Sequence, residues 1–130
     1  HERYRGYLMI REGDNFVRDL HDHSTPAYHA KAAKYQAMLD AVYMRSLLAP
    51  AFEAAEVTGF GPSVDPTTGE LRPGLGVDFR ITLDRRRVPG HISAVERAVQ
   101  ATLVQELISV APVAFTHTVA DVDTFTLTSG

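Results

Sequence analysis

The stretch from Leu75 to Leu83 reads LGVDFRITL and has the clearest strand pattern in the sequence. Apolar residues stand at every second position, and glycine or polar residues fill the positions between them. This period of two predicts a β-strand with one face in the core and the other face toward water. The apolar face, which includes Val77, Phe79 and Ile81, must be covered, and we expect helices to cover it.

Two helical patterns flank this strand. The first begins at Ser24-Thr25-Pro26, because a hydroxyl can cap a helix and proline is tolerated at the first helical position. Its apolar stripe recurs at steps of three and four residues, as does that of the second helix. The stripes are Tyr28, Ala32, Tyr35, Leu39, Val42 and Tyr43 in the first helix, and Ile92, Val95, Val99, Leu103 and Leu107 in the second.

Three weaker strand signals complete the pattern. We expect strands over 3–10, over 56–60 and within 115–127, with a long irregular connection at 62–74 that is rich in proline and glycine. Asp14 is expected to cap a short helical turn after the first strand. Residues 1–130 then form a single α+β domain, a ferredoxin-like β-α-β-β-α-β sandwich. Its four-stranded, mostly antiparallel sheet carries two long helices on one face.

Composition narrows the functional classes. The net charge of −3 provides no positive field for phosphates, so we expect no nucleic-acid partner. The chain has no cysteine, which excludes disulfides and thiol chemistry. No apolar run approaches the roughly 20 residues that span a bilayer, so no membrane insertion by this sequence is expected. The chain begins at His1, and we expect a domain excised from a longer protein that carries its targeting segments elsewhere.

Several ordered landmarks are similar to the SEA domain family of mucins and heparan-sulfate proteoglycans. Residues 5–10, RGYLMI, resemble the opening strand of that family, and residues 24–28, STPAY, resemble its helix start. Residues 39–48 resemble the end of that helix, and residues 56–60 resemble the strand that follows. The resemblance implies the split β-α-β fold and an extracellular or cell-surface setting, as part of a larger membrane-associated or matrix glycoprotein.

The most informative landmark is the segment 72–79, RPGLGVDF. In self-cleaving relatives this place holds a Gly-Ser bond followed by β-branched residues, and the serine hydroxyl attacks the preceding carbonyl. Here Gly74 is followed by Leu75 and Gly76, so the resemblance implies a degenerate autoproteolysis motif. An acyl shift needs an oxygen nucleophile, and leucine has none. We therefore expect no autoproteolysis.

Three further groups of residues are candidate sites. His21 and His23 flank Asp22, but no further ligands cluster with them, so we expect no metal site and no cofactor. Asp22-His23-Ser24 holds the residue types of a hydrolase triad, yet sequence neighbours cannot form the required relay. Arg85, Arg86 and Arg87 form the densest basic run and are a candidate contact for anionic glycans, with a solvated loop as the alternative.

The sequence thus favours a non-enzymatic, extracellular structural or adhesive SEA-like module. Its expected partners are neighbouring domains of the same parent chain, with glycans or extracellular proteins as further candidates. Two alternatives remain open. One is a self-cleaving module that uses another hydroxyl, from Ser63, Thr67 or Thr68. The other is an intracellular ferredoxin-like domain for ligand binding or assembly.

Overall fold

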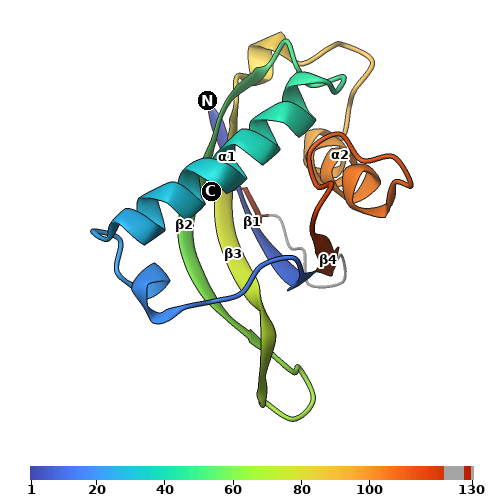
Figure 1. The fold of residues 1–130 in the computed structure, drawn as a ribbon. Helices are drawn as coiled ribbons and strands as arrows, with labels where there is room; N and C mark the ends of the chain where they lie inside the picture. The colour runs from blue at the N-terminus through green and yellow to red at the C-terminus, as the bar shows by residue number, and fades with distance from the viewer. Residues whose placement is uncertain (122–127, 130) are drawn as a thin grey trace.

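An antiparallel sheet forms the centre of the fold. The protein was analysed as a computed structural model, which describes residues 1–121 and 128–129. The path across the sheet is β2 (Phe52–Val64), β3 (Leu71–Leu83), β1 (Glu2–Glu12) and β4 (Val119–Asp121), while β5 (Thr128–Ser129) also pairs with β1. With helices after β1 and after β3, the element order confirms the predicted α+β fold (Figure 1).

The strand predicted at 75–83 is longer than its pattern indicated. β2 and β3 each have 13 residues and pair as one hairpin, where the sequence predicted an irregular connection. The prediction was wrong because register shifts accommodate residues that cannot pair regularly in the ladder. Pro62 lies inside the shift between Gly61 and Ser63. At the tip, the Asp65 carboxylate accepts hydrogen bonds from two backbone N–H groups and closes the turn.

The first long helix, α1, spans Pro26–Met44 and begins as predicted. The Thr25 hydroxyl accepts a hydrogen bond from the Tyr28 N–H at 3.1 Å, and Pro26 occupies the first turn. Every residue of the predicted apolar stripe is buried. The predicted core role of Tyr28, Tyr35 and Tyr43 is therefore confirmed. Figure 1 shows α1 lying across β2, β3 and β1.

The second long helix, α2, spans Val95–Ile108 and buries Val95, Val99 and Leu103. It touches α1 through the Tyr43 hydroxyl, which donates to the Val99 carbonyl at 2.7 Å. The chain after α2 folds back because the buried Glu106 carboxylate accepts hydrogen bonds from three consecutive N–H groups, those of residues 113–115, at 2.8 to 2.9 Å. These hydrogen bonds could not be predicted from local patterns, since a glutamate in a helix is ordinarily exposed.

The predicted core forms as expected. Val77, Phe79 and Ile81 are at most 1% exposed, and they pack in one cluster with the buried stripes of both helices. The last predicted strand, within 115–127, is matched in part by β4, and its remainder at 122–127 lies outside the described residues. Two short 3-10 helices, η1 (Arg18–His21) and η2 (Arg85–Arg87), complete the chain.

Candidate functional site

The degenerate motif lies on β3, where Gly74 has a backbone conformation that only glycine adopts readily. Its φ is 137°, and it is buried. A Cβ atom at this position would lie 2.4 Å from the Ile10 carbonyl oxygen on the neighbouring strand β1. Both the positive φ and the close approach require glycine here. The fold therefore admits only glycine without strain at the residue that precedes Leu75.

The loop after β1 holds Gly74 from both sides. The Gly74 N–H donates to the Asn15 Oδ1 atom at 3.1 Å, and the Phe16 N–H donates to the Gly74 carbonyl at 2.8 Å. Both polar backbone groups of Gly74 thus have hydrogen-bond partners. The donor on the carbonyl lies where an attacked carbonyl would develop negative charge, so this arrangement would also favour cleavage if a nucleophile were present.

Asp14 fixes this loop to α1. Its side chain is 8% exposed and accepts hydrogen bonds from Lys31 Nζ at 2.8 Å, Lys34 Nζ at 3.1 Å and the Tyr35 hydroxyl at 2.8 Å. The predicted capping role of Asp14 was wrong: η1 begins after Val17, which makes no side-chain cap. Because the partners of Asp14 lie 17 to 21 residues away, a local sequence pattern could not indicate them.

Ionisation of Asp14 is strongly favoured in the folded chain. Burial opposes the charge, but the hydrogen bonds from Lys31, Tyr35 and Lys34 outweigh it and lower the pKa of Asp14 to about 2. Burial and the hydrogen bond to Asp14 raise the pKa of the Tyr35 hydroxyl. The cluster of Asp14, Lys31, Lys34 and Tyr35 is therefore a charged anchor for the loop that holds Gly74.

This anchor predicts a pH-dependent stability. The folded-state pKa of Asp14 lies below the unfolded value of about 4, so its contribution is complete above pH 4 and is lost as the pH falls toward 2. We expect Asp14→Asn to lower the free energy of unfolding at pH 7 by about 2 kcal/mol and by much less at pH 2. Urea unfolding at both pH values tests this, with the exposed Asp19→Asn as control. An equal loss at both pH values would contradict it.

The two residues after Gly74 differ in their surroundings. Leu75 is fully buried on the helix-facing side of β3, and its side chain carries no oxygen. Gly76 pairs with Met9 of β1 in regular register, and with Gly61 of β2 at the edge of the register shift. A Cβ atom on Gly76 would lie 2.5 Å from the Tyr7 hydroxyl, so glycine at this position leaves room for the Tyr7 ring to lie over the strand.

The structure brings one of the three alternative hydroxyls close to Gly74. Ser63 is fully buried, and its Oγ lies 3.3 Å from the position that a Cβ on Gly74 would take. The same Oγ accepts a hydrogen bond from Arg72 Nε at 3.3 Å. Thr67 and Thr68 instead lie in the exposed tip of the hairpin. Of these three residues, only Ser63 is placed beside the motif.

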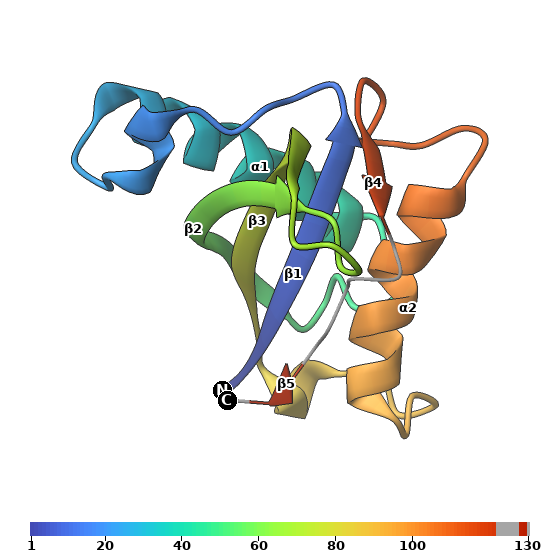
Figure 2. The ribbon, with the colours of Figure 1, turned by 90° about the horizontal axis from the view of Figure 1, so that it is seen from below.

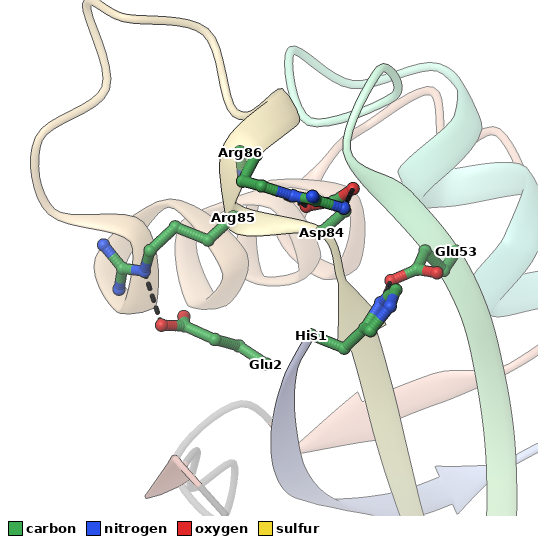
Figure 3. A network of polar contacts seen from close by, with 6 residues as sticks. All are labelled: His1, Glu2, Glu53, Asp84, Arg85 and Arg86. Atoms are coloured by element: carbon green, nitrogen blue, oxygen red, sulfur yellow. Dashed lines mark hydrogen bonds and ion pairs between the residues drawn. The ribbon is translucent and has the colours of Figure 1, made fainter.

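The basic run at 85–87 forms η2, and acidic neighbours contact two of its three residues (Figure 3). Arg85 donates to the Glu2 carboxylate, and Arg86 donates to both oxygens of Asp84 at 3.2 Å. Arg87 is exposed. The positive charge that these residues offer to an anion is therefore partly neutralised, although Arg86 remains 84% exposed.

The histidine pair lies at the end of η1 and just after it. His21 and His23 are exposed, and the His23 ring stacks on Tyr28 with the ring centres 4.2 Å apart. Within residues 1–121 and 128–129, no group of three histidine, cysteine, aspartate or glutamate residues is placed to hold a metal ion. In the same part of the chain, no helix has the length and apolar character needed to cross a membrane.

Comparison with known families agrees with this arrangement. The family model described as SEA domain matches residues 2–113, which includes β1, α1, the β2–β3 hairpin with Gly74, and α2. No curated protein matches the chain. The family match covers far more than half of the 130 residues, and it includes every residue of the candidate site.

Proposed function

Because the chain belongs to the SEA domain family, we propose that it is a non-catalytic structural or adhesive module of an extracellular glycoprotein, and that it stays uncleaved. The observation that carries this proposal is the buried Leu75, which follows Gly74 and offers no nucleophile. A module with an intact chain at this position can connect its neighbours. Its proposed partners are adjacent domains of the parent chain.

The extracellular location and the uncleaved state can be tested separately. The family supports the extracellular location, and an epitope tag inserted at Gly69 in the parent protein tests it, because this position is exposed at the hairpin tip. We expect antibody to label intact cells or secreted protein. Labelling only after permeabilisation would favour the intracellular alternative.

The uncleaved state is tested by introducing a serine nucleophile after Gly74. Leu75→Ser places a hydroxyl next to the Gly74 carbonyl, which already accepts a hydrogen bond from Phe16. We nevertheless expect slow or no cleavage, because the exchange also removes a fully buried leucine and weakens the packing that holds this part of β3 in place. Leu75→Ala is the matched control, since it loses the same packing without gaining a hydroxyl. Rapid cleavage of the serine variant after Gly74 on a denaturing gel would contradict this expectation.

One second function is favoured by a specific observation, the placement of Ser63 beside Gly74. In that alternative, the Ser63 hydroxyl attacks the Gly74 carbonyl from the neighbouring strand, and an ester to Ser63 forms as the amide bond to Leu75 breaks. The hydroxyl proton is transferred to the leaving Leu75 amine, and water then hydrolyses the ester slowly. The two functions are distinguished by Ser63→Ala. If the wild-type chain is cut and this variant is not, Ser63 is the nucleophile and the module is self-processing.

A further inference from the structure

The face of the sheet that points away from the helices contains a hollow of about 360 Å³. Figure 2 looks onto the sheet with α1 behind it. The hollow extends over three strands and is lined by Arg5 and Gly6 from β1, Thr58 from β2, and Asp78, Phe79 and Arg80 from β3. Its volume falls in the range of small-ligand sites. The residues of the cleavage motif do not line it.

Two guanidinium groups share one side of this hollow. Arg5 lies directly opposite Arg80 in the β1–β3 ladder, and like charges in such pairs repel each other. Arg80 Nη2 donates to Glu56 at 2.7 Å, while its Nε is buried without a hydrogen-bond partner. Arg5 makes no ion pair with any residue that the structure describes. The Arg5 guanidinium is therefore without a carboxylate partner among the described residues and can accept an anion.

An acceptor and a hydroxyl contribute other parts of the lining. Asp78 has no ion pair within the described residues, and burial raises the pKa of its carboxyl. Thr58 lies within the register shift between Val57 and Gly59, so its side chain is exposed. The hollow thus combines guanidinium donors with a carboxylate acceptor and a hydroxyl. Such a lining complements a ligand that carries both an anionic group and hydrogen-bond donors.

We propose that this hollow binds a small hydroxycarboxylate, whose carboxylate accepts hydrogen bonds from Arg5 and Arg80 and whose hydroxyl groups donate to Asp78. The planar guanidinium fork matches a carboxylate in geometry. A dianion such as sulfate or phosphate fits less well, because the Asp78 carboxylate in the same hollow repels the additional charge. The proposal does not depend on whether the chain is cleaved.

The test is an NMR titration of the uniformly ¹⁵N-labelled protein with four probes. D-gluconate carries a carboxylate and hydroxyls, acetate lacks the hydroxyls, D-glucose lacks the carboxylate, and sulfate is a dianion. We expect gluconate to shift the amide signals of Gly6, Phe79 and Arg80 with a millimolar Kd. Acetate is expected to bind about tenfold more weakly, and glucose and sulfate weaker still.

Matched variants complete the test. Arg5→Gln is expected to weaken gluconate binding at least about tenfold, because a charge-assisted hydrogen bond is lost. Arg3→Gln changes an exposed arginine on the same strand that does not line the hollow, and it should bind like the wild type. Asp78→Asn should reduce the preference for gluconate over acetate. Sulfate binding as tight as gluconate, or unchanged binding by Arg5→Gln, would overturn the proposal.

Discussion

Replacing Phe79 with alanine is expected to lower the free energy of unfolding by about 3 to 5 kcal/mol. The ring is 1% exposed and lies in the core beneath both helices. It also fills the space next to Gly6, its cross-strand partner: a Cβ on Gly6 would lie 2.2 Å from the ring. Gly6 has no side chain that could fill the cavity left by the ring.

Urea unfolding measures this loss. Leu71→Ala on the same strand is the control, since Leu71 is 73% exposed and its truncation should cost less than about 0.5 kcal/mol. A loss below about 1 kcal/mol for Phe79→Ala would contradict the assignment of the core face of β3.

Gly74→Ala is expected to cost about 3 kcal/mol or more, through two effects that add. Its φ of 137° disfavours any side chain, and the new Cβ would meet the Ile10 carbonyl oxygen at 2.4 Å. That oxygen belongs to the backbone of a central strand, so it cannot move without disturbing the ladder. The variant should therefore be among the most destabilised single substitutions in the chain.

Another glycine separates the two effects. Gly69 also has a positive φ, 74°, but no atom lies within 4 Å of its Cβ position. Gly69→Ala should therefore show the conformational cost alone, about 1 kcal/mol. If Gly74→Ala costs no more than Gly69→Ala under the same denaturant conditions, the close packing against Ile10 is wrong.

Local patterns predicted the elements whose causes are local. The alternation at 75–83, the stripe of α1 and its start at Thr25 depend on residues within a few positions of one another, and all are present. The stripe of the second helix was predicted in part: Val95, Val99 and Leu103 are buried in α2, whereas Ile92 precedes the helix and Leu107 is only partly buried. The hairpin between β2 and β3 was missed because proline and glycine ordinarily indicate a loop. Here a register shift removes the need for the missing Pro62 N–H.

The candidate site was predicted only in part. The resemblance located Gly74, Leu75 and Gly76, but it did not indicate that Gly74 has a positive φ or that Gly76 pairs with Met9 in regular register. The bonds from Asn15 and Phe16 to Gly74 span 58 to 59 residues, and the placement of Ser63 depends on the shift in the β2–β3 register. Such contacts arise from topology, which residue spacing alone does not determine.

The peptide bond after Gly74 is expected to remain intact because Leu75 supplies no nucleophile. Intact-mass spectrometry of the purified wild-type chain, after prolonged incubation in the folded state and complete denaturation, tests this. A single species at the mass of the whole chain, 14.3 kDa, is expected. Two fragments that end and begin at the bond between Gly74 and Leu75 would contradict it.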